Sequence, residues 1–217
     1  MFQRIFTLLF PSRCVLCGKF LSKNETDLCH HCRQNAPEFT KSNLRFSFLA
    51  GWTCVWYYKD TVRSSILRYK FRNRRSYAQA YGRVLAMKLQ KEDLDDFDIL
   101  TFVPISFLRR LKRGYDQCAL LADTVGSELG VTPVRTLQKI RHTPPQSGIA
   151  DVSQRRANVL GAYKPLHRES LSGKRILLLD DIITTGATVS ECARVLLTAG
   201  AKEVYCASIA VANHNLK

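Results

Sequence analysis

The sequence predicts an α/β protein in which a parallel sheet is flanked by helices and preceded by a small metal-binding module. Short apolar segments alternate with helical segments from residue 52 onward, which is the pattern of a parallel sheet with crossover helices. Four cysteines cluster in two pairs near the N-terminus. The 217 residues suffice for one substantial core and a small appendage.

Each expected strand is a short run rich in apolar, aromatic or β-branched residues. Residues 175–179 read Arg-Ile-Leu-Leu-Leu, and such uninterrupted apolar runs are typical of strands that are buried on both faces of a sheet. The strands expected on this basis span residues 52–58, 98–105, 131–137, 175–179 and 204–212.

The expected helices show apolar residues at helical spacing between these strands. Asp60 and Ser153 are expected to cap the first and fourth of them, because their side chains can accept hydrogen bonds from helix N-terminal amides. Gly130 and Gly200 are expected to end the third and fifth. The predicted helices span residues 61–69, 76–90, 116–129, 153–160 and 189–199.

The composition is that of a globular protein with a strong excess of positive charge. The chain is 46% hydrophobic and 24% charged, and its net charge is +15. Such a basic protein is expected to bind polyanions: phosphorylated small molecules, nucleic acid or an acidic membrane surface. No apolar run approaches the roughly 20 residues of a membrane-spanning helix. We expect a cytoplasmic protein, with peripheral contact at the inner face of the membrane as an alternative, and residues 2–10 as a short amphipathic helix.

Two C-x2-C pairs with eleven residues between them predict a metal site. Four thiolates complete the tetrahedral shell of a structural zinc ion. Two disulfides, a redox pair and an iron–sulfur cluster remain open as alternatives. His30 and His31 are expected to stay outside the ligand set. The proposed ligands are Cys14, Cys17, Cys29 and Cys32.

The metal module and the predicted sheet divide the chain into two expected domains. Residues 1–45 would form the N-terminal helix and a module similar to a zinc ribbon, and residues 46–217 the α/β domain. The remaining cysteines stand in apolar patterns and are expected to pack in the core. They are Cys54, Cys118, Cys192 and Cys206.

The strand at 175–179 leads into the segment with the clearest chemical pattern. Asp180 and Asp181 follow it, and a hydroxyl-rich turn over 184–188 then opens a helix. Ligands of parallel sheets bind at this edge, and helix N-termini bind anions. Because the two carboxylates would repel a phosphate, we expect them to face ribose hydroxyls or a cation. The segment therefore predicts a site for a ribose 5-phosphate.

This segment resembles the fingerprint of the type I phosphoribosyltransferases, which bind 5-phosphoribosyl 1-pyrophosphate (PRPP). Residues 103–117 and the combined pattern of 141–148 with 155–159 resemble signatures of the ComF family of competence-associated, phosphoribosyltransferase-like proteins. Residues 69–72 and the four-cysteine N-terminus resemble that family as well. Tyr115-Asp116 stands where many relatives carry phenylalanine and asparagine. The resemblance implies a type I phosphoribosyltransferase-like sheet.

The resemblance also implies roles for individual residues. Asp180 and Asp181 would hold the ribose 2- and 3-hydroxyls and are the candidates for catalytic residues. The 5-phosphate would be bound by Thr184, Thr185, Gly186, Ala187 and Thr188. The segment after Pro104 would contact pyrophosphate, and 141–148 would form a lid. The candidates for binding pyrophosphate are Arg109, Arg110, Arg113 and Arg141.

The activity implied by the resemblance is a glycosyltransferase reaction that uses PRPP as its magnesium complex and a nitrogen acceptor. Its biological setting would be DNA uptake and natural competence, with proteins of the competence machinery as partners. A second hypothesis is a catalytically silent PRPP fold that binds single-stranded DNA or partner proteins during transformation.

A basic run supports the second hypothesis. Residues 59–91 hold ten basic residues and one acid, and 68–75 interleave arginines with aromatics. Such a mixture can contact a phosphate backbone and stack on bases. The alternative is a solubilising surface with Tyr69 and Phe71 in the core. The candidates for nucleic-acid contact are Arg68, Lys70, Arg72, Arg74 and Arg75.

Overall fold

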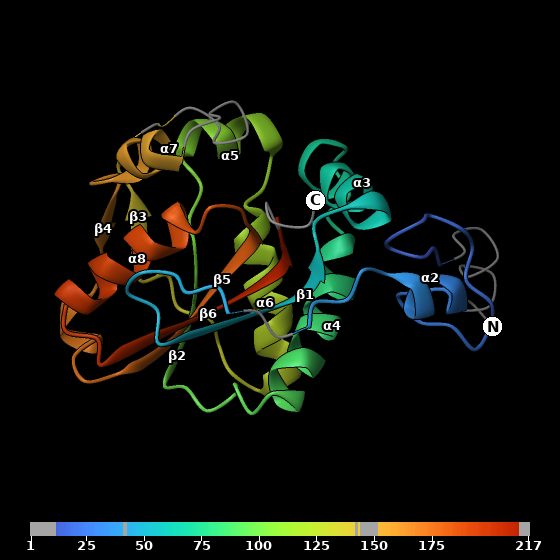
Figure 1. Ribbon diagram of the computed structural model, residues 1–217, viewed down its shortest axis with the longest axis horizontal. Helices are drawn as coiled ribbons and strands as arrows, with labels where there is room; N and C mark the ends of the chain where they lie inside the picture. The colour runs from blue at the N-terminus through green and yellow to red at the C-terminus, as the bar shows by residue number, and fades with distance from the viewer. Residues whose placement is uncertain (1–11, 41–42, 142, 144–151, 213–217) are drawn as a thin grey trace.

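The computed structural model describes residues 12–40, 43–141, 143 and 152–212, except the side chains of residues 152, 153 and 156. The predicted N-terminal helix, His142 and most of the predicted lid lie outside these residues. The centre of the fold is a four-stranded parallel sheet in the order β1-β6-β5-β2 (Figure 1). Its strands, in this order, are Gly51–Tyr57, Glu203–Val211, Arg175–Ile183 and Ile99–Phe102.

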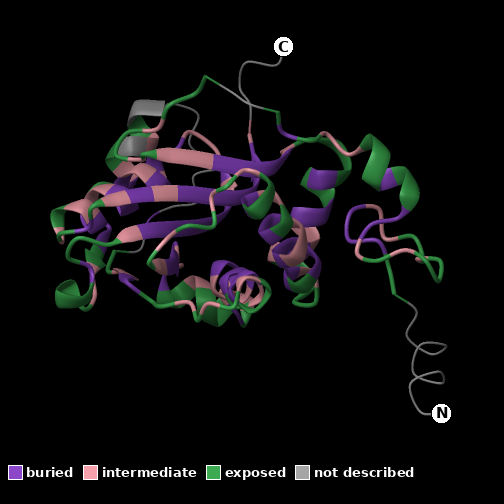
Figure 2. Ribbon diagram, turned by 90° about the horizontal axis from the view of Figure 1, so that it is seen from below, coloured by how far each residue is buried: buried purple, intermediate pink, exposed green. Residues whose placement is uncertain are grey.

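Helices cover both faces of this sheet, as the sequence predicts. Helices α4 (Tyr77–Lys91) and α6 (Gln117–Leu129) pack together on one face. They approach closely because Gly82 of α4 lacks a side chain where Thr124 of α6 lies. Helix α8 (Ala187–Thr198) covers the other face. The strands are therefore largely buried, as Figure 2 shows.

Small elements complete the α8 side of the molecule. Strands β3 (Leu137–Lys139) and β4 (Tyr163–Pro165) form an antiparallel pair. Helix α7 (Val152–Val159) packs against α8. Because this helix begins at Val152, Ser153 lies inside it and is not its cap, contrary to the prediction. A one-turn 3₁₀ helix, η2 (Arg168–Ser170), follows β4.

The expected strand at 131–137 is wrong except for its last residue. The amide of Val131 donates to Gly126 O, and that of Val134 to Leu100 O, so the segment runs beside β2 without a regular ladder. Pro133 between them has no amide hydrogen to donate. The sequence also missed helix α5 (Phe107–Arg113), which is too short and too basic for a clear apolar period.

The segment after the metal module lies along the sheet. Helix α2 (His30–Asn35) ends the module. The amide of Phe39 then donates to Val55 O, and Pro37 O accepts from the amide of Tyr57, which places residues 37–39 beside β1. The domain boundary at 45/46 stays a prediction. Helix α3 (Asp60–Phe71) follows β1; Lys59 takes its N-cap position and Asp60 is its first residue.

Candidate functional site

The two carboxylates lie inside strand β5 and do not follow it, because the strand extends beyond the predicted range of 175–179. Strand β5 continues to Ile183 because its parallel pairing with β6 continues through Asp180 opposite Ser208 to Ile183 opposite Val211. Both aspartates are buried. They therefore stand on a rigid element at the carboxyl edge of the sheet, where ligands of parallel sheets bind.

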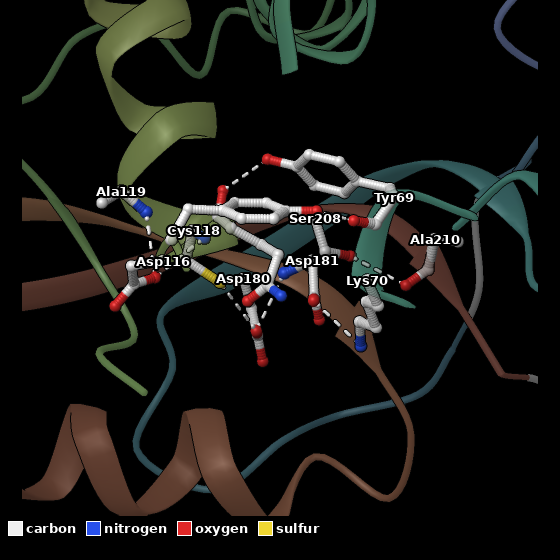
Figure 3. A network of polar contacts seen from close by, with 11 residues as sticks. Tyr69, Lys70, Asp116, Cys118, Ala119, Asp180, Asp181, Ser208 and Ala210 are labelled. Atoms are coloured by element: carbon white, nitrogen blue, oxygen red, sulfur yellow. Dashed lines mark hydrogen bonds and ion pairs between the residues drawn. The ribbon is translucent and has the colours of Figure 1, made fainter. Parts of the chain in front are cut away.

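The neighbours of the two aspartates differ, as Figure 3 shows. Asp181 Oδ2 lies 2.9 Å from Nζ of Lys70, which comes from the end of α3. Asp180 Oδ1 accepts hydrogen bonds from the amide of Asp181 at 2.8 Å and from the thiol of Cys118 at 3.5 Å. Burial and the charge of Asp181 raise the pKa of Asp180 to about 7. The charge of Asp181 is thus compensated by Lys70, whereas Asp180 keeps its proton up to near-neutral pH.

Asp116 supports this arrangement from the start of α6. Its Oδ1 accepts from the amides of Cys118 and Ala119, and its Oδ2 accepts from the amide of Ile105. The side chain therefore caps α6 and ties that helix to the segment that follows β2. Burial raises the pKa of Asp116. An aspartate directly before an amphipathic helix is the sequence signal for such a cap.

The carboxylates of Asp180 and Asp181 and the thiol of Cys118 are close enough together to surround one ion. The ligand atoms of Cys118, Asp180 and Asp181 all lie within 4.8 Å of one another. Burial raises the pKa of Cys118 far above its usual range, so its thiol stays protonated. The carboxylates are the part of this cluster that suits a hard cation such as magnesium.

The predicted phosphate turn opens helix α8. Gly186 takes the N-cap position with φ of +76°, and the amide of Ala187 lies 3.5 Å from Thr185 Oγ1. A small hollow beside the turn is lined by Asp180, Thr184, Gly186 and Thr188, among others. Carboxylate and helix N-terminus therefore meet at one place.

An aromatic side chain that the sequence analysis did not single out closes one side of this turn. A Cβ on Gly186 would collide with the ring of Phe46, which comes from the segment before β1. Phe46 in turn packs on Trp52, with ring centroids 4.9 Å apart. The cluster of aromatics at 46 and 52 is visible in the sequence, but nothing in the spacing places it against residue 186.

The predicted pyrophosphate arginines do not form one group. Arg109 and Arg113 line a cavity of about 590 Å³ between α3 and α5, together with Lys70. Arg110 lies over the ring of Phe107, 5.8 Å from its centroid, and does not line that cavity. Arg141 donates to the carbonyls of Asn158 and Leu160 at the end of α7. The structure thus brings two of the four beside Lys70.

The residues proposed for nucleic-acid contact also separate. Arg68 donates to the carbonyl of Leu16 in the metal module, and Lys70 pairs with Asp181. Arg75 donates to Gly114 O and lies over the ring of Tyr115. Arg72 and Arg74 are exposed on the turn after α3. Of the two interleaved aromatics, Tyr69 is in the core but Phe71 is 62% exposed.

The four clustered cysteines form a compact sulfur site. Their Sγ atoms all lie within 4.8 Å of one another, and those of Cys17 and Cys29 are 3.6 Å apart. Zinc–sulfur bonds of about 2.3 Å in a tetrahedron require sulfur–sulfur distances of about 3.8 Å. The cluster therefore fits structural zinc. All eight cysteines lie in the described ranges, and all are free thiols there.

Helix α2 brings Cys29 and Cys32 together and leaves the two histidines between them outside the sulfur site. Cys29 caps α2, with its Sγ accepting from the amide of Cys32. His30 and His31 are exposed on the same helix. The four remaining cysteines are buried, as expected. None of the helices in the described ranges is long and apolar enough to cross a bilayer.

The metal module is joined by hydrogen bonds to helices α3 and α4, of which α3 also carries Lys70 of the site. Ser65 and Arg68 of α3 donate to the carbonyls of Val15 and Leu16, which lie within the first cysteine pair. Arg83 of α4 donates to both carboxylate oxygens of Asp27. Lys70 lies only two residues after Arg68, so one helix touches both the metal module and the carboxylates.

Known families match both parts of the chain. A model described as "Phosphoribosyl transferase domain" matches residues 116–217, and one described as "Double zinc ribbon domain" matches residues 5–43. The first range includes the carboxylates and the turn at α8, and the second includes all four clustered cysteines.

Curated relatives are similar over most of the chain. "Competence protein F" of Haemophilus influenzae is 25% identical, covering 90% of this chain and 95% of the relative. "Competence protein ComFC" of Bacillus subtilis is 27% identical, covering 86% and 72%. "DNA utilization protein YhgH" of Salmonella typhi is 27% identical, covering 90% and 83%.

Solved structures show weaker similarity. Glutamine PRPP amidotransferase from B. subtilis aligns with a TM-score of 0.45 and 22% identity, over 65% of this chain and 30% of the other. Adenine phosphoribosyltransferase from Saccharomyces cerevisiae aligns with a TM-score of 0.35 and 18% identity, over 64% and 72%.

Proposed function

Because the chain belongs to the ComF family of competence proteins, with a phosphoribosyltransferase domain and an N-terminal double zinc ribbon, we propose that it binds PRPP as the magnesium complex and transfers its phosphoribosyl group to a nitrogen acceptor. The relatives named for competence and for DNA utilization support a role in DNA uptake or use. We further propose that the protein acts in the cytoplasm, at times beside the inner face of the membrane.

One observation carries the proposal. Asp180 and Asp181 lie near the carboxyl end of the buried strand β5, and the turn capped by Gly186 follows the strand at the start of α8. Carboxylates accept hydrogen bonds from hydroxyls, and helix N-termini attract phosphate. A ribose 5-phosphate carries hydroxyls that the carboxylates can bind and a phosphate that the helix N-terminus can bind.

The remaining contacts of the proposed substrate follow from the cavity beside Lys70. Arg109 and Arg113 would hold the pyrophosphate, because guanidinium groups bind phosphate oxygens in pairs. The magnesium ion that accompanies PRPP would supply positive charge to the leaving group. The carboxylates of Asp180 and Asp181 would hold this ion as hard oxygen ligands.

The transfer breaks the bond between C1 of the ribose and the pyrophosphate oxygen and forms a bond from C1 to the acceptor nitrogen. The bond's electron pair leaves with pyrophosphate. An acceptor nitrogen that carries a proton releases it to water, whereas a ring nitrogen that carries none becomes positively charged. The cationic side chains beside C1 lower the barrier by stabilising the charge that develops on pyrophosphate. The zinc module would hold α3 in place through Ser65 and Arg68, and takes no part in the chemistry.

A calorimetric titration of the zinc-loaded protein with PRPP tests the proposal. We expect micromolar binding that requires magnesium and is lost in Asp180→Asn/Asp181→Asn. Asp95→Asn removes an exposed carboxylate and should bind PRPP as the wild type does. Absence of binding by the wild type would contradict the proposal, and so would equal binding by the double variant.

The second candidate is a silent PRPP fold that binds single-stranded DNA or partner proteins during transformation. The exposed arginines at 72 and 74, next to the exposed ring of Phe71, favour it. It predicts full biological function for the Asp180→Asn/Asp181→Asn variant. The transferase proposal predicts the loss of that function together with PRPP binding.

A further inference from the structure

We propose that the cavity between α3 and α5 is the acceptor subsite of the transfer reaction, and that it selects a planar nitrogen heterocycle bearing a negative charge. This inference rests on the proposed transferase function. The cavity holds about 590 Å³, which is within the range of small-molecule sites. Its lining residues are Lys70, Phe71, Asn73, Leu108, Arg109, Lys112 and Arg113.

The position of the cavity suits the acceptor. Lys70 lines it and at the same time lies 2.9 Å from Asp181, so the cavity adjoins the carboxylates proposed to bind ribose hydroxyls. The phosphate turn adjoins the neighbouring carboxylate, because Asp180 and Gly186 line one hollow. A ribose anchored at that turn would direct C1 toward the cavity.

The charge of the cavity favours an anionic ligand. Four of the described residues that line it are cationic, and none of them is acidic. Asp181 compensates one of the four, Lys70. Burial and the nearby charge of Arg113 lower the pKa of Arg109, as expected for cations held together without a counterion. An anion entering the cavity would relieve this repulsion.

The apolar part of the cavity favours a ring. Phe71 is 62% exposed and Leu108 is 58% exposed, so both present apolar surface to the ligand space. Successive helical residues differ by about 100°, so Phe71 points away from the core that Tyr69 enters two residues earlier. The guanidinium of Arg113 lies 5.0 Å from the centroid of the Phe71 ring. A planar heterocycle can stack on this ring while its anionic group meets Lys112.

Pyrophosphate alone does not account for these features. It has no apolar surface, so the rings and methyl groups of Phe71 and Leu108 would contribute nothing to its binding. The half-buried Arg109 and Arg113, which are proposed to hold pyrophosphate, suffice for phosphate oxygens near C1. The exposed side of the cavity, with Phe71, Leu108 and Lys112, is then available to a second, ring-shaped reactant.

The test compares nicotinate with nicotinamide, which differ only in a carboxylate against an uncharged amide. Both are added to the zinc-loaded full chain with magnesium and PRPP, and saturation-transfer NMR follows their ring protons. We expect nicotinate to bind at least ten-fold more tightly. Equal binding of the two, or no binding of either, would overturn the inference while leaving calorimetric PRPP binding intact.

Matched variants locate the binding. Phe71→Ser should weaken nicotinate at least ten-fold, whereas Phe107→Ser removes an equally exposed ring (62%) outside the cavity and should change nothing. Lys112→Gln should also weaken nicotinate, and Arg63→Gln, an exposed cation on α3, should not. Equal losses in the members of either pair would overturn the inference. PRPP affinity should survive Phe71→Ser.

Two further outcomes distinguish an acceptor subsite from a cavity with another role. If PRPP does not bind but nicotinate does, the transferase proposal fails and the assignment as an acceptor subsite fails with it. If an oligothymidylate displaces nicotinate and its own binding depends on Phe71, the cavity is a nucleic-acid site and the inference is overturned.

Discussion

Lys70 and Asp181 form an ion pair that joins helix α3 to strand β5, with Nζ and Oδ2 2.9 Å apart. Their side chains are only 18% and 10% exposed, so water screens the pair poorly. Lys70 also lines the cationic cavity. The pair therefore links the proposed ribose contact to the proposed pyrophosphate and acceptor contacts.

Replacing Lys70 by methionine should destabilise the protein and weaken PRPP binding. The change leaves the Asp181 carboxylate buried without its cation, which costs about 2–4 kcal/mol in unfolding free energy. Denaturant titration measures this loss. Lys174→Met breaks a more exposed contact with Asp98, at 3.6 Å, and should cost less than about 1 kcal/mol. Equal losses in the two variants would contradict the importance of the Lys70 pair.

The stability of the unliganded protein should fall as pH rises toward and through 7 because of Asp180. Burial raises the pKa of this carboxyl from 3.8 to about 7, so the folded protein holds its proton more tightly than the unfolded chain. The resulting stabilisation is complete below pH 3.8 and is lost by the time pH exceeds about 7.

The measurement is the unfolding free energy of wild type and Asp180→Asn at several pH values between 5 and 8. The asparagine variant should lose this component of the pH dependence and gain stability relative to wild type as pH rises. Asp95→Asn, at an exposed position, should follow the wild-type profile. Parallel profiles for wild type and Asp180→Asn would rule out the proposed protonation.

Local patterns predicted the elements that carry the site, but not the partners of their side chains. The apolar run before Asp180 indicates a buried strand, which the structure confirms, and the two C-x2-C pairs indicate a metal site, whose four cysteines the structure brings together. The sequence assigned Lys70 to nucleic acid because its neighbours are basic. Its ion pair with Asp181 depends on the packing of α3 against the sheet, which no local pattern encodes.

Two elements differ from the prediction for the same reason: helix α5 at 107–113 was missed, and strand β5 was expected to end before residues 180–183. Helix α5 lacks an apolar face that enters the core, so no helical period marks it. Strand β5 extends through polar Asp180 and Asp181 because β6 supplies hydrogen-bond partners along its whole length. Pairing between distant segments, and not local propensity, decided both the strand's end and the burial of its carboxylates.

Zinc removal should expose four thiols and leave the other four protected. A chelator that removes the metal leaves Cys14, Cys17, Cys29 and Cys32 without the ion that they bind together, so they should react with a thiol reagent under native conditions. Cys54, Cys118, Cys192 and Cys206 are buried in the α/β body and should react only after denaturation. Eight reactive thiols after chelation alone would show instead that the body unfolds with the module.

Gly186→Ala should impair the phosphate turn for two separable reasons. Alanine at a φ of +76° costs about 1–2 kcal/mol, and its Cβ would also collide with the ring of Phe46. Gly130→Ala provides the control, because Gly130 has φ of +71° and open space around its Cβ position. It should lose only the backbone component.

Adding Phe46→Ala to Gly186→Ala should recover the steric component alone, when compared with Phe46→Ala by itself. Denaturant titration of the four variants gives the interaction energy between positions 46 and 186. Additive losses would mean that the ring of Phe46 does not press on the turn. PRPP titrations of the same variants would show whether the turn's shape controls phosphate binding.

Binding of single-stranded DNA through the basic run should depend on Arg72 and Arg74. Both are exposed, whereas Arg68 and Arg75 donate to backbone carbonyls of the protein itself. Removing one phosphate contact lowers the slope of log affinity against log salt by about 0.7 for single strands, so Arg72→Ala/Arg74→Ala should reduce it by about 1.4. Lys59→Ala/Arg63→Ala removes the same charge from the start of α3 and should leave the slope nearly unchanged. A wild-type affinity that does not vary with salt would reject DNA binding, and equal slopes for the two double variants would place the contact elsewhere on the molecule.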